Sequence, residues 1–257
     1  MLAVSNITYE VDGKALIKDV SVSFHPGKLN LVIGPNGAGK STFVRLICNQ
    51  LKPKIGSVRY GSTPVDSISI SDLAKIRAVL SQNIELAFPL TVAEVVMMGR
   101  YPHFHSKPTG IDQKACEEAM CFFDIQDFAD RNYLTLSGGE KQRVQFARVM
   151  AQIWFPEKEH CRYLILDEPL TFLDVRYQFD FMHKLLDLRK KDLVIIAVVH
   201  DLNLVSKFAD EVVLLAEGKL LASGNKDQVL SKENIKKAYH LDPVIHVDNG
   251  KRYLFFE

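Results

Sequence analysis

The chain has 257 residues, of which 47% are hydrophobic and 25% charged, and its formal net charge is +1. This ordinary globular composition allows a sizeable core, and nothing in it points to a nucleic-acid-binding surface, so we expect no nucleic acid among the partners. No signal peptide is recognisable at the N-terminus, and no apolar run approaches the roughly 20 residues of a membrane helix. Four scattered cysteines, Cys48, Cys116, Cys121 and Cys161, show neither metal-ligand nor disulfide spacing, which favours reduced thiols in the cytosol.

The first third of the chain predicts a hairpin, a strand, a glycine-rich loop and a helix. Asp12-Gly13 is a strong tight-turn pair between two β-rich segments. Apolar residues at helical spacing follow the glycine-rich loop. The expected elements are strands at residues 7–11, 16–24, 29–33 and 78–81 and a helix at residues 40–49.

The middle of the chain changes to helical patterns. Thr91 is a good N-cap, and Glu94 stands at the third helical position, as in a capping box. The expected helices cover residues 92–98, residues 112–123 and a segment that ends near Ile153. We therefore expect one domain, residues 1–257, with an inserted helical subdomain of about residues 86–152.

Alternating strands and helices then resume. The expected elements are strands at residues 163–166, 193–199 and 212–216, helices at residues 174–189 and 202–208, and a closing hairpin of residues 244–247 and 252–256. The strand Tyr163 to Leu166 is fully apolar, which is typical of a parallel sheet covered on both faces. The mixed-charge run of residues 226–237 predicts an exposed amphipathic face. Together these patterns predict an α/β fold with a mostly parallel core sheet.

A phosphate-binding loop is expected between the strand at residues 29–33 and the helix after it. The pattern Gly-x-x-x-x-Gly-Lys-Ser/Thr is filled by Gly34, Pro35, Asn36, Gly37, Ala38, Gly39, Lys40, Ser41 and Thr42. Backbone N–H groups of such a loop turn toward phosphate oxygens, and the helix adds the positive end of its dipole. We expect Lys40 to reach the β- and γ-phosphates and Ser41 to bind Mg²⁺. A chance glycine-rich turn is the alternative, and the strand–loop–helix context argues against it.

Polar residues follow the ends of three predicted strands, where an open parallel sheet binds its ligands. We expect Asp167 to belong to the Mg²⁺ shell and Glu168 to act as the general base toward water. His200 is placed to contact the γ-phosphate. Gln82 could bind Mg²⁺ or position water, although it carries little signal alone. The alternatives are that Asp167 and Glu168 form a solvated acidic turn and that His200 has a structural role.

A second candidate phosphate binder lies at residues 136–140, Leu-Ser-Gly-Gly-Glu. Ser137 is a plausible N-cap of a long helix, with Gly138, Gly139 and Glu140 behind it. The glycine backbone, which has no side chains, and the serine hydroxyl can both approach an anion. One nucleotide has a single terminal phosphate, so two loops aimed at it pose a geometric question.

These motifs occur in the order found in ATP-binding-cassette (ABC) ATPases, which the chain resembles along essentially its whole length. The resemblance implies a P-loop NTPase fold with an N-terminal antiparallel β subdomain. It also implies that Tyr9 stacks on adenine and that Asp174 lies on the loop linking two active sites. The chain departs from the family's usual Thr-Ser-Ala-Leu-Asp at residues 170–174, where Phe172 replaces a much smaller alanine.

The same resemblance answers the geometric question. It implies that the phosphate loop of one copy holds ATP while Ser137 to Glu140 of a second copy closes on the γ-phosphate. The implied partners are that second copy, two integral membrane permease subunits and, indirectly, a substrate-binding protein. The expected location is peripheral, on the cytoplasmic face of the membrane.

Two segments indicate the kind of transporter. Val96 to His103, with its Gly-Arg-Tyr-Pro-His phrase, resembles importer ATPases for iron–siderophore, haem and cobalamin, and residues 152–162 resemble an insertion of haem importers. Our leading hypothesis is therefore the energy-coupling subunit of a haem-type importer. The other hypotheses are a siderophore or cobalamin importer, a soluble cassette ATPase acting in DNA repair or on ribosomes, and a phosphate-loop kinase or GTPase. We interpret His103, His105, His160 and Cys161 as subunit-contact or solvated residues rather than metal or haem ligands.

Overall fold

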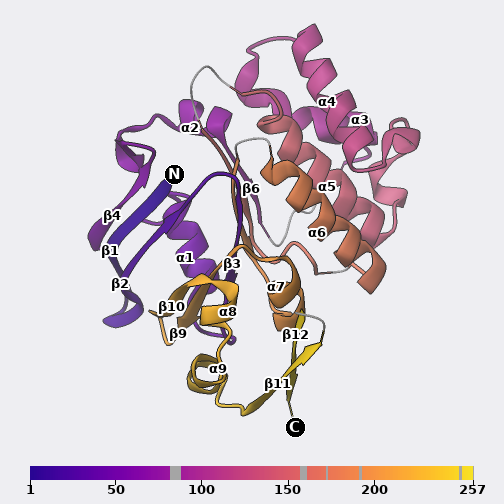
Figure 1. The fold of residues 1–257 in the computed structure, drawn as a ribbon. Helices are drawn as coiled ribbons and strands as arrows, with labels where there is room; N and C mark the ends of the chain where they lie inside the picture. Colours follow the sequence, from indigo (N-terminus) through magenta and orange to yellow (C-terminus); the bar gives the residue numbers. More distant parts are fainter. Residues whose placement is uncertain (82–87, 157–160, 172, 191–192, 249–250, 257) are drawn as a thin grey trace.

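The computed structural model describes residues 1–257 with the exception of 82–87, 157–160, 172, 191–192, 249–250 and 257 (Figure 1). Its strands are β1 (Leu2–Val11), β2 (Lys14–Phe24), β3 (Lys28–Ile33), β4 (Ile55–Tyr60), β5 (Thr63–Pro64), β6 (Arg77–Leu80), β7 (Arg162–Leu166), β8 (Leu193–Val198), β9 (Glu211–Ala216), β10 (Lys219–Asn225), β11 (Pro243–Asp248) and β12 (Lys251–Phe256). Its α-helices are α1 (Lys40–Ile47), α2 (Ile70–Ile76), α3 (Val92–Met97), α4 (Gly110–Phe122), α5 (Gly138–Gln152), α6 (Val175–Arg189), α7 (Leu202–Phe208), α8 (Lys226–Val229) and α9 (Lys232–Tyr239).

A six-stranded sheet organises the molecule. Its strand order is β10-β9-β3-β8-β7-β6, and every neighbouring pair is parallel except β9 with β10. β3 lies between β9 and β8, so the glycine-rich loop leaves the sheet among buried strands. The predicted mostly parallel core sheet is confirmed.

The two faces of this sheet pack against different layers, because side chains alternate along each strand. In β3, Leu29, Leu31 and Ile33 belong to a core shared with α3 to α7, whereas Val32 belongs to a core shared with α1 and the N-terminal strands. Figure 1 shows α1 on one side of the sheet and α5 and α6 on the other. Burial on both faces explains why β7 and β8 are continuously apolar.

The N-terminal strands form a separate antiparallel sheet of order β2-β1-β4-β5. The hairpin of β1 and β2 turns at Asp12 and Gly13, both at positive φ, as the sequence predicts. This sheet closes over α1. It agrees with the expected N-terminal antiparallel β subdomain, so the predicted fold class is confirmed.

The helices α3, α4 and α5 gather beside β6, with the 3₁₀ segment η2 (Met98–His103) among them (Figure 1). Thr91 and Glu94 form the capping box expected at the start of α3. Glycine at position 99 is required by packing, because a Cβ there would overlap the backbone carbonyl of Arg148 on α5. The extent of the inserted subdomain, about residues 86–152, stays a prediction.

Trp154 and Arg162, in the segment after α5, are more buried than the polar sequence around them suggests. Trp154 is only 7% exposed, its ring meets Phe122, and its Nε1 donates to Glu118 Oε2 at 2.5 Å. Arg162 donates through Nη1 to the carbonyls of Ile153 and Trp154. The segment therefore fastens the end of α5 to α4 and β7.

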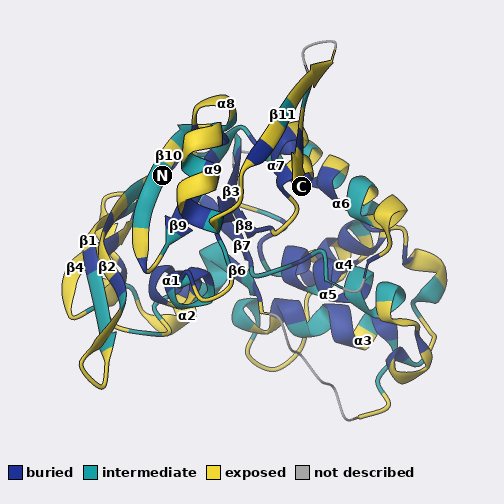
Figure 2. Cartoon of the chain, turned by 90° about the horizontal axis from the view of Figure 1, so that it is seen from below, coloured by how far each residue is buried: buried dark blue, intermediate teal, exposed yellow. Residues whose placement is uncertain are grey.

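Residues 226–237 form α8 and the start of α9, whose lysines are largely exposed while Ile235 is buried, as the charge pattern predicts. The closing hairpin of β11 and β12 projects from the body with mostly exposed side chains (Figure 2). Cys48 and Cys116 are buried, and none of the four cysteines, all of which are described, forms a disulfide. No described helix has the length and apolar character needed to cross a membrane.

Candidate active site

The functional candidates converge because parallel strands end at the same edge of the sheet. β3 leads into the glycine-rich loop, β7 into Asp167 and Glu168, and β8 into His200. β6 leads toward Gln82, which lies outside the described residues. The sheet therefore brings together residues that are up to 166 positions apart, from Gly34 to His200.

The phosphate loop is arranged around the ammonium group of Lys40. Lys40 is 6% exposed, and its Nζ donates to the carbonyl oxygens of Gly34 at 2.8 Å and Pro35 at 3.0 Å. Burial lowers the pKa of Lys40, although the nearby charges of Glu168 and Asp167 oppose this effect. A phosphate arriving in the loop would thus meet a buried cation held by two neutral carbonyls.

Gly39 precedes α1 in a backbone conformation that glycine favours, with φ +93°. A Cβ on this residue would lie 2.8 Å from both the carbonyl oxygen of Leu16 and the Cδ1 of Ile17. The loop is thus pressed against β2. This close approach explains why the second glycine of the pattern cannot carry a side chain here.

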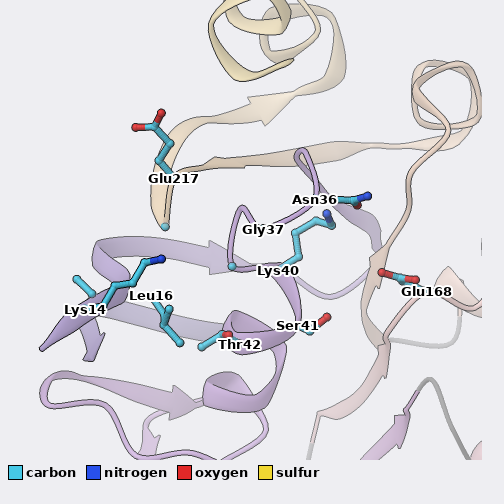
Figure 3. Close-up of a pocket in the computed structure, with 12 residues that line it drawn as sticks. Lys14, Leu16, Asn36, Gly37, Lys40, Ser41, Thr42, Glu168 and Glu217 are labelled. Atoms are coloured by element: carbon cyan, nitrogen blue, oxygen red, sulfur yellow. The ribbon is translucent and has the colours of Figure 1, made fainter. Parts of the chain in front are cut away.

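A cavity of about 550 Å³ opens in front of the loop (Figure 3). Its lining residues are Lys14, Ala15, Leu16, Asn36, Gly37, Gly39, Lys40, Ser41, Thr42, Glu168, Glu217 and Gly218. In Figure 3, Ser41 and Glu168 lie toward one end, while Lys14 and Glu217 lie toward the other. The cavity therefore joins the phosphate loop to a region beyond it that carries two charged side chains.

Asp167 has one carboxylate oxygen that makes no hydrogen bond among the described atoms. The Ser41 hydroxyl bonds to the Asp167 carboxylate, while Asp167 Oδ1 is buried without a hydrogen-bond partner among the described atoms. Desolvation and the charge of Glu168 raise the pKa of Asp167, against the Ser41 hydrogen bond and the positive charges of Arg45 and Lys40. A hydroxyl beside an under-coordinated carboxylate is a donor set that suits a hard cation such as Mg²⁺.

Glu168 and His200 face each other. His200 Nε2 lies 2.8 Å from Glu168 Oε1, and Glu168 adopts φ +52°, which is uncommon for a residue with a side chain. Glu168 lines the phosphate-loop cavity and also a second cavity of about 240 Å³ that reaches His200. Its carboxylate therefore lies between the phosphate loop and the histidine.

Tyr9 is separated from this arrangement. It lies in β1 opposite Ile17, is half-buried, and is not among the described residues that line the cavity. The cavity wall on that side consists of Lys14, Ala15 and Leu16 at the start of β2. The expected stacking of Tyr9 on adenine stays a prediction.

The residues of the predicted second phosphate binder form the capped start of α5. Glu140 Oε2 accepts hydrogen bonds from the backbone N–H and the hydroxyl of Ser137, both at 2.8 Å, and these bonds lower the pKa of Glu140. Ser137 and Gly138 are exposed, and a Cβ on Gly138 would meet open space. None of Ser137, Gly138, Gly139 and Glu140 lines the cavity of the phosphate loop. Within one chain, the two loops do not share a pocket.

Asp174 begins α6, where its Oδ1 accepts from the backbone N–H of Tyr177 at 3.0 Å. Pro169 and Leu173, which lie between Glu168 and Asp174, are hydrogen-bonded to two different helices. Gln142 Nε2 of α5 donates to the Pro169 carbonyl at 3.0 Å, and Gln178 Nε2 of α6 donates to the Leu173 carbonyl at 3.1 Å. Phe172, the departure noted in the sequence, lies outside the described residues.

Sequence reasoning missed Lys14, Glu217 and Gln142. Lys14 and Glu217 line the cavity only because the β9–β10 turn packs on β2, where the Lys18 N–H donates to the Gly218 carbonyl at 2.7 Å. No local pattern marks such a contact between segments 200 residues apart. For Gln142 a weak signal existed, because it lies two residues after the Leu136–Glu140 motif.

The Gly-Arg-Tyr-Pro-His phrase has an internal role. Arg100, 3% exposed, pairs through Nε with Asp112 Oδ1 at 2.9 Å and donates to the carbonyl of Ala151 at 2.8 Å. His103 Nε2 lies 2.7 Å from the carbonyl of Gln152. His103 is half-buried, so one ring nitrogen is engaged at the end of α5 while its interpretation as a subunit-contact or solvated residue stays a prediction. His160 lies outside the described residues, and those described contain no cluster of metal ligands.

Comparison with known proteins identifies the family of the chain. The model of the ABC transporter family matches residues 17–171. The chain is 39% identical over 249 residues to the hemin import ATP-binding protein HmuV of Escherichia coli O157:H7, covering 96% of this chain and 95% of that protein.

Two solved structures extend the comparison to the fold. An inward-facing transporter described as of the metal-chelate ABC type matches with a TM-score of 0.81 at 23% identity, covering 100% of this chain and 96% of the other. A dimeric post-hydrolysis state of the ABC cassette MJ0796, bound to ADP and Pi, matches with a TM-score of 0.74 at 25% identity, covering 88% and 99%. With its phosphate loop, its acidic strand end and the capped start of α5 in place, the chain belongs to the ABC transporter family.

Proposed function

We propose that this chain is the ATP-hydrolysing, energy-coupling subunit of a haem importer. Two copies bind ATP between them at the cytoplasmic face of the membrane and drive two integral membrane subunits supplied by a substrate-binding protein. The observation that carries the hydrolytic function is the position of Glu168, which lies between the phosphate-loop cavity and His200. The similarity to a hemin import ATP-binding protein supports the cargo.

Lys40 provides the electrostatic part of ATP binding. Its ammonium group exchanges the carbonyls of Gly34 and Pro35 for the β- and γ-phosphate oxygens. A charge-assisted hydrogen bond to a phosphate is stronger than one to a neutral carbonyl. Because Lys40 is nearly buried, little water screens the interaction.

Ser41 and Asp167 are the described residues that would hold Mg²⁺, with Gln82 as a further proposed ligand. The buried Asp167 Oδ1 that lacks a hydrogen-bond partner supports this role. The bound ion supplies positive charge to the β- and γ-phosphate oxygens. It would also favour the ionised form of Asp167, opposing the effect of burial.

Glu168 accepts the proton of the attacking water, and His200 orients the Glu168 carboxylate and contacts the γ-phosphate. Their 2.8 Å contact fixes one carboxylate oxygen of a residue that lines the phosphate-loop cavity. A general base of this kind contributes about 10²–10⁴-fold to the rate. The unusual φ of Glu168 is consistent with strain held at a functional position.

Completion of the site requires a second copy. The exposed start of α5 is free to meet the ATP of another chain, and its residues are absent from the cavity of its own phosphate loop. Ser137, Gly138 and Gly139 then present a hydroxyl and backbone N–H groups to the γ-phosphate. Glu140 and Asp174 hold the capped helix starts on either side, and Tyr9 provides a surface for adenine.

The test is transport by the assembled complex. The chain is reconstituted with its two membrane subunits in proteoliposomes, and ATP-dependent uptake of haem, cobalamin and a ferric siderophore is measured in parallel. We expect haem uptake and haem-stimulated ATP hydrolysis. Uptake of cobalamin or the siderophore instead of haem would overturn the proposed cargo.

The matched control is Glu168→Gln, which removes the base while keeping the size of the side chain. We expect hydrolysis and uptake to fall by about 10²–10⁴-fold, while ATP binding persists. Undiminished hydrolysis in this variant would contradict the role of Glu168 whatever the cargo is.

A further inference from the structure

The hydrogen bond from Gln142 to the Pro169 carbonyl connects two functional segments of one chain. Gln142 is half-buried on α5, one turn after the exposed Ser137–Gly138 start of that helix. Its Nε2 reaches the Pro169 oxygen at 3.0 Å. Pro169 directly follows Glu168, the residue to which we assign the role of general base.

The backbone around Pro169 has little torsional freedom. Proline fixes its own φ, so few soft torsions separate the Pro169 carbonyl from the backbone of Glu168. Glu168 already holds an uncommon positive φ, which limits how it can adjust. A shift of α5 that pulls on the carbonyl therefore changes the direction of the Glu168 side chain.

The far end of the same segment is anchored as well. Gln178 of α6 donates to the carbonyls of Leu173 at 3.1 Å and Leu170 at 3.4 Å. The Leu173 Cδ2 atom is the nearest described neighbour of a Cβ built on Gly139, at 4.0 Å. Pro169 is thus held by α5, and Leu170 and Leu173 are held by α6.

We propose that Gln142 is a positioning residue that couples the two ATP sites of the dimer. The proposal rests on the shared-site dimer proposed above, in which the start of α5 contacts the ATP held by the other copy. Gln142 then relays the position of α5 to Glu168, which acts on the ATP held by its own copy. When the dimer closes on one ATP, the general base Glu168 at the other ATP is aligned in this way.

The test compares Gln142→Leu with Gln142→Lys in the complete chain. Leucine removes the donor at similar size, whereas the lysine ammonium can still donate to the Pro169 carbonyl. An exposed glutamine of α4, Gln113, supplies the control Gln113→Leu. The measurements are the ATP affinity of the monomer without Mg²⁺, the kcat, the KM and the Hill coefficient of hydrolysis.

For Gln142→Leu we expect unchanged monomer affinity, a kcat lowered roughly three- to tenfold, as for the loss of one hydrogen bond, and a Hill coefficient that falls from near the number of sites, about two, toward about one. Gln142→Lys should restore much of the cooperativity, and Gln113→Leu should match the unaltered chain. A merely structural role would lower kcat without changing cooperativity.

Dimer formation is followed separately in the Glu168→Gln background, where bound ATP persists. Gln142→Leu should still dimerise on addition of ATP, measured by light scattering, which shows that the variant folds and binds. Wild-type cooperativity in Gln142→Leu would overturn the coupling alone. Hydrolysis by the unaltered chain without any cooperativity would instead overturn the shared-site dimer on which the coupling rests.

Discussion

His200 Nε2 and Glu168 Oε1 lie 2.8 Å apart, although the two residues follow different strands of the central sheet. β7 and β8 are parallel neighbours, with Leu166 opposite Ala197, so their ends place the two side chains together. The contact gives the carboxylate a defined direction at the edge of the phosphate-loop cavity.

Replacing His200 with alanine should lower kcat by roughly 10²-fold, because Glu168 loses the group that orients it. His200→Gln, which can still donate a hydrogen bond, should retain more activity than His200→Ala. The measurement is steady-state ATP hydrolysis of the purified subunit at saturating ATP. The exposed His105 provides the control, since His105→Ala should leave the rate unchanged, and equal losses in both alanine variants would contradict the assignment.

Asp167→Asn should stabilise the nucleotide-free protein at neutral pH while it reduces Mg²⁺-dependent hydrolysis. Burial and Glu168 raise the pKa of Asp167 in the folded state above its ordinary value of 3.8, so the ionised carboxylate destabilises the fold at neutral pH. The gain from asparagine should shrink as the pH falls through the raised pKa toward 3.8, because the native aspartate then becomes protonated.

This prediction is checked by melting temperatures in the presence of a chelator, from neutral pH down to about pH 4. Asp187 offers a control in which the pKa shift has the opposite direction, because a hydrogen bond from Lys190 lowers the pKa of Asp187. Asp187→Asn should therefore not raise the melting temperature. A stabilisation by Asp167→Asn that did not depend on pH would rule out the electrostatic explanation.

Ser137→Arg should block hydrolysis while leaving the ATP affinity of the monomer largely intact, because Ser137 does not line the cavity of its own phosphate loop. Fluorescent-nucleotide binding and hydrolysis are measured on the same preparation. The matched control is Ser231→Arg, which also replaces an N-cap serine, at the start of α9. It should cost about 1 kcal/mol in helix capping and keep hydrolysis. Loss of monomer binding in Ser137→Arg would place the second loop in its own chain's site.

Arg100→Leu should lower the free energy of unfolding by about 3–5 kcal/mol, because it leaves the buried Asp112 without its partner. Burial tends to raise the pKa of Asp112, but hydrogen bonds from Thr109 and Arg100 outweigh it and lower that pKa. Urea unfolding measures the change. The double variant Arg100→Leu/Asp112→Leu should recover part of the loss, and Lys237→Ala, in an exposed ion pair, should cause no resolvable change.

The sequence identified the features that depend on neighbouring residues. The glycine-rich loop, the capping box at Thr91, the N-cap at Ser137 and the apolar strands β7 and β8 all follow from short patterns, and the structure contains them. It also contains β4, α2 and β10, which the patterns did not reveal. β4 is an example, because exposed residues alternate with Val58 and Tyr60 over only part of its length.

The features that could not be predicted depend on contacts between segments that are distant in the sequence. Trp154 looks like part of a polar insertion, but its burial depends on Phe122 and Glu118 of α4. The cavity wall beyond the phosphates depends on how the Glu217 turn packs on β2. Gln142 acquires its partner only when β7 ends beside α5. Such relationships are set by the tertiary fold and leave little trace in local sequence.

Gly99 shows what kind of information the Gly-Arg-Tyr-Pro-His phrase carries. The backbone of α5 passes so close to Gly99 that no side chain fits, and Arg100 and His103 bond to the last carbonyls of that helix. The three residues therefore set how the segment Met98–His103 packs against the end of α5. A change at any of them would alter the angle between two parts of this chain before it altered a contact with any other molecule.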